Sequence, residues 1–285
     1  MIATNYIVTP KSDQAFRFTR FIILVLVVLA VFFPILLISF YAFNLNSLAV
    51  GFSVKKLLSS FIWLIDHLDI LTGLKNSLMR SVFTPIITCF VCFFAAYAIA
   101  MGKGKFFSVT YAYIVLSLYF IAGPLFSYLN MSSLSLTGSF WPYVLPYLFN
   151  SLYTIVLVAS VKEVPREYAE EARVQGASEL QIAWHVYLPV LSSRMVAVYV
   201  LCFIIHWNDY VDTLLYNFSS TDLYTLQYMS HSYTNNIISA ISHHGSAISV
   251  SVTSVKMAMT VLLILPVVIL IPMFRRGIVG FLKKT

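Results

Sequence analysis

The sequence contains little charge for its length. Only 10% of its 285 residues are Asp, Glu, Lys or Arg, whereas 60% are hydrophobic and the mean hydropathy is +0.86. A soluble domain of this size has about 25% charged residues, because it must cover its surface with polar groups. The composition therefore excludes a soluble globular protein and indicates an integral membrane protein.

Cysteine is scarce as well. Cys89, Cys92 and Cys202 all lie inside apolar runs, so no disulfide framework is expected. Cys89 and Cys92 form a CxxC pair, but no further cysteine and no histidine lies in that run, and buried cysteine usually behaves as a small apolar residue. The chain also lacks a Gly-rich phosphate-binding loop. We expect no metal site, no catalytic residue and no cofactor bound by this chain.

Long apolar runs are abundant. A helix needs about 20 apolar residues to cross a bilayer. The runs of that length are Phe21–Phe43, Asn76–Met101, Ser108–Leu129, Trp141–Val161, Ser193–Leu215 and Ala247–Phe274. We predict an all-α bundle of six transmembrane helices, in which 1–20 form an N-terminal arm and 21–285 form one membrane domain.

Basic residues are concentrated in alternate connections between these runs. They occur in the N-terminal arm, between the second and third runs, in segment 162–194 and in the C-terminal tail. The other connections hold only Lys55, Lys56 and Lys75. Because cytoplasmic loops of membrane proteins are rich in Lys and Arg, we predict that both termini and segment 162–192 are cytoplasmic.

One polar segment, residues 165–189, separates the fourth and fifth apolar runs. We refer to it as the polar segment; its sequence is PREYAEEARVQGASELQIAWHVYLP. Five of the chain's 11 acidic residues lie in or beside it: Glu163, Glu167, Glu170, Glu171 and Glu179. Anionic lipid headgroups attract basic helices, so this acidic content argues against a helix that lies on the lipid surface. A docking element for a cytoplasmic protein is the better interpretation.

The polar segment has the signals of two short helices joined by a turn. Pro165 suits the first position of a helix, and Gly176 suits its end. Ser178 and Gln181 have the spacing of a capping box, which starts a second helix that we expect Pro189 to end. Arg166 with Glu170, and Glu170 with Arg173, have the spacing of ion pairs along the first helix. In the second helix we expect a shared face of Leu180, Ala183, Trp184 and Tyr187.

The spacing of residues in the polar segment resembles a known family signature. Glu170, Glu171 and Ala172 are followed after three residues by Gly176, and after nine more by Val186-Tyr187-Leu188-Pro189. This pattern resembles the EAA signature of ABC-importer permeases, which reads Glu-Ala-Ala, three residues, Gly, nine residues, Ile-x-Leu-Pro. Glu171 replaces the first Ala, and Val186 replaces Ile. Pro165 and Glu167 lie where these permeases often read Pro-x-Glu, while Gln175 replaces a common Asp.

Other stretches resemble the carbohydrate-uptake permeases of the maltose type, in particular their smaller subunit. Asn76-Ser77 opens the second apolar run, and Ala95-Ala96-Tyr97-Ala98 closes it. Trp207-Asn208-Asp209 resembles the Trp-Asn-Asp/Glu element of that branch. The tail 274–284 resembles its closing Phe-Gly-Gly-Lys pattern, with one residue fewer between the glycines. The resemblance covers nearly all of the chain from Phe21 onward.

The resemblance implies a transport subunit in the bacterial cell (inner) membrane, not an enzyme. It implies an extracytoplasmic solute-binding protein, a second permease subunit that completes a heterodimeric pore, and two cytoplasmic ATPase subunits that use ATP; it implies no nucleic acid. The implied ATPase-coupling residues are Glu167, Glu170, Glu171, Ala172, Gly176, Val186, Leu188 and Pro189. The implied cargo is a sugar or oligosaccharide. Another small solute, such as glycerol phosphate or a polyamine, stays open, as does a secondary transporter.

Ionisable residues inside apolar runs are the first candidates for the solute pathway. Lys256 lies about ten residues into the sixth run, near the bilayer midplane, and either pairs with Asp209 or contacts solute. Arg80 lies about one turn below the outer face, close enough to snorkel, and is either a structural anchor or a solute contact. Trp207, Asn208 and Tyr210 offer rings and an amide of the kind that sugars bind.

Overall fold

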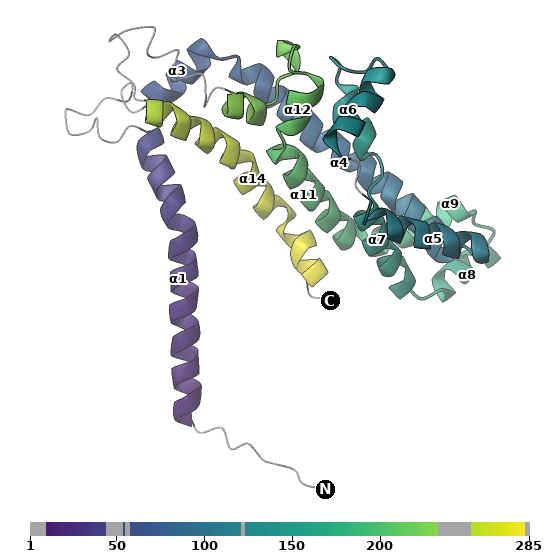
Figure 1. The fold of residues 1–285 in the computed structure, drawn as a ribbon. Coiled ribbons are helices and arrows are strands. Elements are labelled where there is room, and N and C mark those ends of the chain that lie inside the picture. The colour runs from purple at the N-terminus through teal and green to yellow at the C-terminus, as the bar shows by residue number, and fades with distance from the viewer. Residues whose placement is uncertain (1–9, 44–53, 55–57, 121–122, 233–251, 283–285) are drawn as a thin grey trace. The chain divides into compact units, whose positions relative to one another are not determined.

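The computed structural model describes residues 10–43, 54, 58–120, 123–232 and 252–282. All regular elements in these ranges are helices, as the sequence predicts for an all-α protein (Figure 1). The chain forms two compact units. The first comprises Met1–Asp66 with Ile241–Leu262, and the second comprises His67–Ala240 with Leu263–Thr285.

The first unit contains α1 (Pro10–Ala42), α3 (Ser59–His67) and the beginning of α14 (Val252–Leu282). Within α1, Phe16–Ala42 is long and apolar enough to cross a membrane. The helix begins at Pro10, so the described part of the predicted N-terminal arm is continuous with the first span. Lys256 lies in this unit; residues 247–251 of the predicted sixth span lie outside the described residues.

The second unit is built around α4 (Ile70–Met101), which packs along its length against α7 (Ser151–Glu163) and α11 (Ser192–Asn208). Small residues on α4, such as Ala96, let the neighbouring helices approach closely. The core between the three helices includes all three cysteines, which are free and buried. They pack there as small apolar side chains, as their place in apolar runs indicates.

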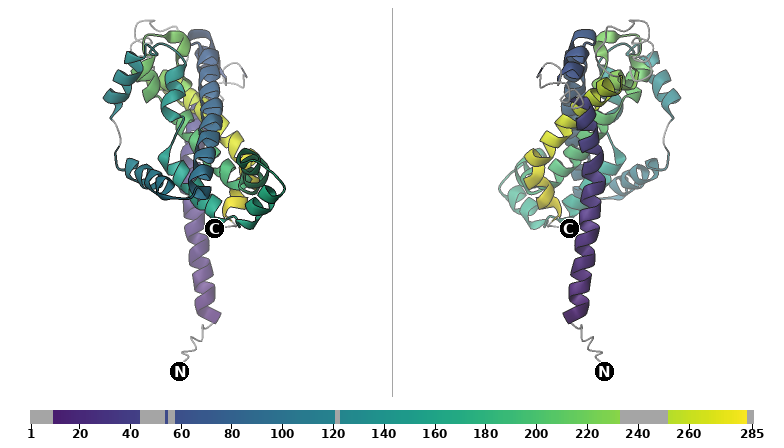
Figure 2. Two further views of the ribbon diagram at one scale, coloured as in Figure 1. Left: turned by 90° about the vertical axis from the view of Figure 1, so that its right-hand side faces the viewer. Right: turned by 90° about the vertical axis from the view of Figure 1, so that its left-hand side faces the viewer.

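The third predicted span, Ser108–Leu129, is not one helix. The structure forms α5 (Lys105–Ser117) and α6 (Pro124–Ser133) instead, which lie towards opposite ends of α4 (Figure 2). Pro124 is the first residue of α6, and Gly123 before it is extended at ψ 163°. A residue that precedes proline is sterically driven out of the helical region, so an apolar run interrupted in this way does not continue as one helix.

Two further predicted spans are bent. Trp141–Val161 consists of the 3₁₀ turns η2 (Trp141–Tyr143) and η3 (Leu145–Tyr147), followed by α7 at an angle of 47°. Ser193–Leu215 is interrupted at Asp209, beyond which α12 (Val211–Tyr216) begins. By length and composition, three described helices can cross a membrane, or five if each bent pair makes one span. The count of six spans stays a prediction.

Candidate functional site

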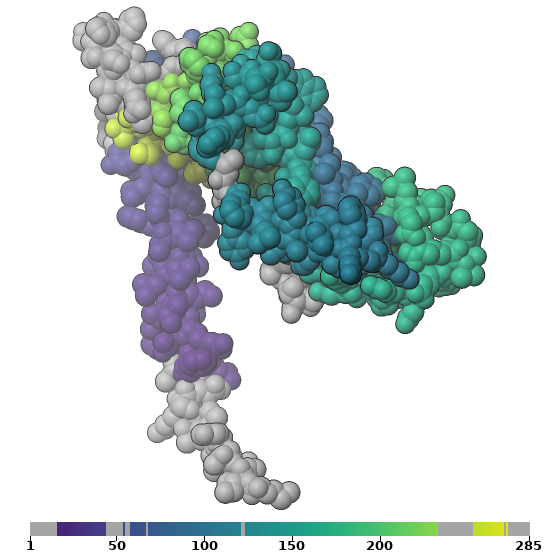
Figure 3. Space-filling model, turned by 45° about the vertical axis from the view of Figure 1, so that its right-hand side comes forward, coloured from purple at the N-terminus to yellow at the C-terminus, as the bar shows by residue number. Residues whose placement is uncertain are grey.

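The polar segment folds into two short helices at the α5 end of α4 (Figure 1). The first helix is α8 (Glu167–Val174), and the second begins with α9 (Glu179–Ile182). It continues through the π turn η4 (Ala183–Tyr187) into α10 (Leu188–Val190). In the space-filling view these residues form a lobe at one end of the second unit (Figure 3). The predicted helix-turn-helix is therefore present.

Gly176 makes the turn between the two helices. Its φ of +87° lies in the left-handed region, which favours glycine. Its N–H donates to the carbonyl of Arg173 at 2.9 Å, and the N–H of Ala177 donates to the carbonyl of Ala172 at 3.0 Å. This Schellman pattern satisfies the last carbonyls of α8. A Cβ at Gly176 would meet no atom within 4 Å, so backbone conformation alone requires glycine here.

The second helix begins at the predicted capping box. The N–H of Ser178 donates to Oε1 of Gln181 at 2.8 Å, and the N–H of Gln181 donates to Oγ of Ser178 at 3.4 Å. Each side chain thus satisfies an N–H group that the helix leaves unpaired at its start. The turn and the cap together fix the angle at which the second helix leaves Gly176.

The prolines of the polar segment do not lie where the sequence suggests. Pro165 precedes the N-cap Arg166 and so stands outside α8. Pro189 does not end the second helix, which continues to Val190 before the chain bends by 80° into α11. Proline lacks an N–H and clashes with the preceding turn of an α-helix. The π turn at Ala183–Tyr187 immediately before it widens the backbone and accommodates the ring.

The buried face of the second helix also differs from the prediction. Ala183 and Tyr187 are buried as expected, but Leu180 is 66% exposed and Ile182 is buried in its place. Trp184 is partly exposed and stacks on the ring of Phe90 in α4, with ring centroids 5.7 Å apart. A regular helix was assumed in the prediction, whereas the π turn changes the spacing of the residues that face α4.

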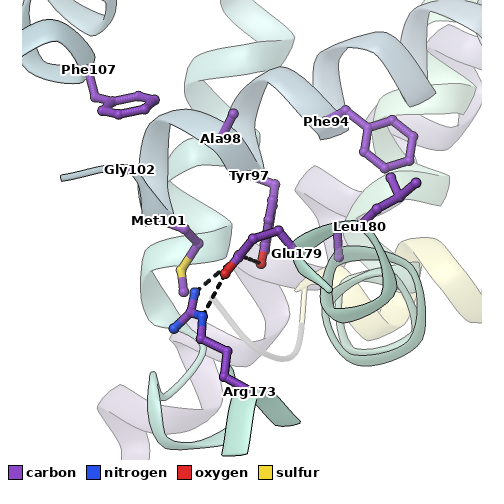
Figure 4. Close-up of a pocket in the computed structure, with 10 residues that line it drawn as sticks. Phe94, Tyr97, Ala98, Met101, Gly102, Phe107, Arg173, Glu179 and Leu180 are labelled. Carbon is purple, nitrogen blue, oxygen red and sulfur yellow. Dashed lines mark hydrogen bonds and ion pairs between the residues drawn. The ribbon is translucent and has the colours of Figure 1, made fainter. Parts of the chain in front are cut away.

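Glu179 joins both helices of the polar segment to α4 (Figure 4). Tyr97 of α4 donates its hydroxyl to Oε2 of Glu179 at 2.7 Å. Arg173 of α8 holds the same carboxylate with two hydrogen bonds, at 2.6 Å and 3.1 Å. The predicted pairing of Arg173 with Glu170 is therefore wrong, because Glu179 is the partner. Sequence spacing within one helix could not indicate a bond that crosses the turn.

A cavity of about 380 Å³ lies between the end of α4, the beginning of α5 and the polar segment (Figure 4). Its lining is mostly apolar and includes Phe94, Met101, Phe107 and Leu180, with the bonded pair of Arg173 and Glu179 beside them. Beside this cavity the polar segment also packs on α4, because Ile182, Ala183 and Tyr187 are buried in the same apolar core as Ala96 and Tyr97.

The side of the polar segment that faces away from α4 is acidic with an apolar tip. Glu167, Glu170 and Glu171 are exposed, and none of them makes an ion pair within the described part of the chain. Val174, at the last turn of α8, is 89% exposed. Of the other predicted coupling residues, Ala172, Val186 and Leu188 are partly buried and Pro189 is exposed.

A second group of polar residues follows α4 toward its other end. Polar side chains recur there at every fourth residue: Asn76, Arg80, Thr84 and Thr88. Each binds a segment that is not α-helical: Asn76 donates to the carbonyls of Asp222 and Tyr224, Thr84 to that of Tyr143, and Thr88 to that of Tyr147. Such segments have free carbonyls that need donors. The four-residue spacing is visible in the sequence, but spacing alone does not identify the carbonyls that these side chains bind.

Arg80 is the central residue of this stripe and is fully buried. One of its guanidinium nitrogens donates to the carbonyl of Asp209 at 3.0 Å, and the other binds the carboxylates of both Asp209 and Asp212. Tyr147 donates its hydroxyl to Asp212 at 2.8 Å. We call these four residues the Arg80 cluster. Arg80 does not snorkel to the surface, because its side chain is 0% exposed.

The structure thus gives Asp209 a partner other than Lys256, which the sequence suggested. Lys256 belongs to the first unit, and its contacts stay a prediction. Asp212 and Tyr147 were missed as interacting residues. Both lie in segments that appear as parts of long spans in the sequence, where no pattern indicates which side chains converge on α4.

The other candidates at this end divide into buried and exposed side chains. Trp207 is buried, and its indole N–H donates to the carbonyl of Leu263 at 2.9 Å. Asn208 is exposed and accepts a hydrogen bond from Gln227 at 3.3 Å. Tyr210 stacks on His231 with ring centroids 4.2 Å apart. The described residues contain no group of three or more His, Cys, Asp or Glu side chains arranged to hold a metal ion.

Similar proteins include transport permeases. Protein LplC of Bacillus subtilis (strain 168) is 29% identical over 147 residues, which span 51% of this chain and 50% of LplC. The polygalacturonan/rhamnogalacturonan transport system permease protein YtcP of the same organism is 23% identical over 208 residues, 70% of this chain and 72% of YtcP. The chain thus spans only about half the length of LplC. No family model matches the chain.

The fold is similar to that of a chain in the crystal structure of a bacterial ABC transporter involved in the import of the acidic polysaccharide alginate. The TM-score is 0.79 at 21% sequence identity, and the match covers 94% of this chain and 98% of that chain. The predicted helical permease fold is therefore confirmed. The resemblance to ABC-importer permeases is supported twice, by a relative named as a permease and by this fold.

Proposed function

We propose that this chain is a transmembrane permease subunit of a binding-protein-dependent ABC importer for sugars or oligosaccharides. The observation that carries the proposal is the polar segment. Two short helices are set at a fixed angle by Gly176, attached to α4 through Glu179, and followed by an 80° bend into α11. Such an element transmits force between a partner outside the membrane and a membrane helix.

The exposed face of the polar segment supports docking to an ATPase subunit. Its three glutamates are exposed and make no ion pair among the described residues, and the apolar Val174 is 89% exposed. A charged rim beside an exposed apolar residue is the composition of a protein-binding surface. In this proposal two cytoplasmic ATPase subunits bind and hydrolyse ATP. The two helices of the polar segment transmit the movement of these subunits to α11 and α4.

The other proposed partners are those of a binding-protein-dependent ABC importer. A second permease subunit completes the pore, and an extracytoplasmic solute-binding protein delivers the solute. Both termini and the polar segment lie in the cytoplasm, as the distribution of Lys and Arg indicates. The polysaccharide-related names of YtcP and of the alginate transporter favour a carbohydrate cargo. A glycerol phosphate or polyamine permease is the second candidate, since the coupling element does not depend on the solute.

A reversal of charge on the polar segment tests the ATPase assignment. In Glu170→Lys we expect loss of the ATPase subunits during purification of the transporter, and loss of sugar uptake, because the exposed carboxylate becomes a cation. Asp222→Lys is the matched control. Asp222 is also exposed, but it lies near the other end of α4, where its carbonyl accepts from Asn76. That variant should retain the ATPase subunits. Normal ATPase retention and uptake in Glu170→Lys would contradict the proposal.

The cargo is tested by uptake of labelled sugars and of glycerol phosphate in cells that lack this chain. Restoration by the wild-type chain identifies the solute class. Uptake of glycerol phosphate alone would reject the carbohydrate assignment but leave the coupling assignment intact.

A further inference from the structure

The Arg80 cluster encloses more acid than base. Arg80 is 0% exposed, and the side chains of Asp212 and Asp209 are only 6% and 21% exposed. Among the described residues, Arg80 is the one cation that contacts either carboxylate. If both carboxylates were ionised, the cluster would therefore carry one uncompensated negative charge in a site that water barely reaches. Such a charge is unfavourable, because a buried ion without a partner loses its hydration.

The geometry makes the second charge still less favourable. Oδ2 of Asp209 and Oδ2 of Asp212 bind the same guanidinium nitrogen, which brings the two carboxyl groups together. Two carboxylates that share a site do not both ionise readily. The other titratable groups that face them are Tyr143, Tyr147, Tyr216 and His206, and none of these supplies a second full positive charge.

The two carboxyl groups differ in their surroundings. Asp209 follows the last residue of α11 and accepts a hydrogen bond from the N–H of Val211 at 2.8 Å. Burial disfavours its charge, but Arg80 outweighs burial and holds the pKa of Asp209 below its usual range. Burial raises the pKa of Asp212 to about 7, although Arg80 opposes the rise. Asp212 is thus the group that retains a proton.

We propose that Asp209 and Asp212 hold one proton between them beside Arg80, and that this neutral cluster fixes the joint between α11 and α12. If the chain is the proposed permease, this joint bears on transport, because Asn208 and Tyr210, two of the predicted pathway residues, flank it. Arg80 also binds the backbone carbonyl of Asp209, so the cluster sets the path of the main chain there. Arg80 and the two acids are positioning residues in this scheme. The proton count rests on the cluster alone and does not depend on the proposed function.

The proton is tested directly by infrared difference spectroscopy of the purified transporter that contains this chain, compared at pH 6 and pH 9. The wild type should show a band of a protonated carboxyl group that disappears at the higher pH, and Asp212→Asn should lack it. Asp222→Asn is the control, because Asp222 is exposed and should leave the band unchanged. Absence of the band in the wild type, or its persistence in Asp212→Asn, would overturn the proposal.

A pair of neutral replacements provides an independent test. Asp212→Asn mimics the protonated acid and should leave the melting temperature of the transporter nearly unchanged. Asp209→Asn should also be tolerated, since Asp212 then becomes the ionised partner of Arg80. The double variant leaves Arg80 buried without a counter-ion. Its decrease in melting temperature should greatly exceed the sum of the decreases in the two single variants. Additive losses, or a large loss in both single variants, would show that both carboxylates are ionised.

Discussion

At the scale of single residues, the buried charge of Arg80 connects α4 to the joint between α11 and α12. Arg80 lies inside an apolar run, where an ionisable side chain is a functional candidate from sequence alone. Its partners are 129 and 132 residues away along the chain, which is a tertiary fact. The sequence suggested Lys256 as a partner of Asp209, which stays a prediction, and did not indicate Arg80 as its partner. It did not indicate that Asp212 binds Arg80, because no pattern inside the predicted span Ser193–Leu215 shows which side chains converge on α4.

Thermal stability should depend on pH through Asp212, which lies beyond the end of α11. Its ordinary pKa is 3.8, and burial raises it to about 7 in the folded chain. Between these values the folded state binds more protons than the unfolded state, so stability falls as pH rises, by at most about 1.4 kcal/mol per pH unit. The lowered pKa of Asp209 acts in the opposite sense, but below its ordinary value of 3.8.

The measurement is the melting temperature of the transporter between pH 5 and pH 8, in wild type and in Asp212→Asn. The variant should show a smaller decline across this range. Equal declines would exclude Asp212 as the responsible group.

At the scale of elements, local signals in the sequence were reliable where they concern helix ends. The glycine turn and the capping box of the polar segment both form as predicted, because each is decided by residues within a few positions. The buried face and the end of the second helix were predicted wrongly. The π turn before Pro189 changes both, and it depends on packing against α4 as well as on the proline.

The angle that Gly176 sets between the two helices should affect uptake more than the backbone strain of a substituted residue does. Gly176→Ala forces a side chain into a φ of +87°, at a cost of about 1–2 kcal/mol. Gly104→Ala is the matched control, since its φ is +103° and its Cβ would also meet nothing within 4 Å. Gly104→Ala should lose at least as much stability, because ψ at Gly104 is 173°, a region that side chains rarely adopt, but only Gly176→Ala should reduce uptake strongly. Equal uptake by the two, measured at equal membrane expression, would remove Gly176 from the coupling mechanism.

The hydroxyl of Tyr97 should connect the polar segment to α4. Tyr97→Phe removes its hydrogen bond to Glu179 but keeps the ring beside Tyr187, at a centroid distance of 5.2 Å. A hydrogen bond to a charged group contributes about 1.5–3 kcal/mol. We expect reduced uptake with ATPase subunits still bound. Tyr187→Phe removes only a weak bond to the sulfur of Met101, at 3.4 Å, and is the control. Identical uptake in both variants would contradict the assigned link.

At the scale of the whole molecule, the distribution of charge defines two sides of the membrane. The polar segment and the joint between α11 and α12 lie toward opposite ends of α4 within the second unit (Figure 1). The Lys and Arg bias predicts a cytoplasmic polar segment, and we therefore expect the joint on the opposite side of the membrane.

Thiol labelling tests this orientation. Val174→Cys, in the polar segment, should react with a membrane-impermeant reagent only in inverted vesicles stripped of peripheral proteins. Phe218→Cys, toward the other end, should react only in intact cells. Both side chains are exposed, at 89% and 59%, whereas the natural cysteines are buried and give little background. Labelling of both from the same side would refute the predicted topology.

The sequence by itself determined the membrane class, the helical fold and the presence of two short helices in the polar segment. These follow from composition and from short-range spacing, which act without knowledge of distant residues. Only the tertiary structure decided that Glu179 ties the polar segment to Tyr97 and that Arg80 binds two acids. These contacts join residues 82, 129 and 132 positions apart in the chain. Short-range patterns in the sequence cannot indicate which distant groups meet in the fold.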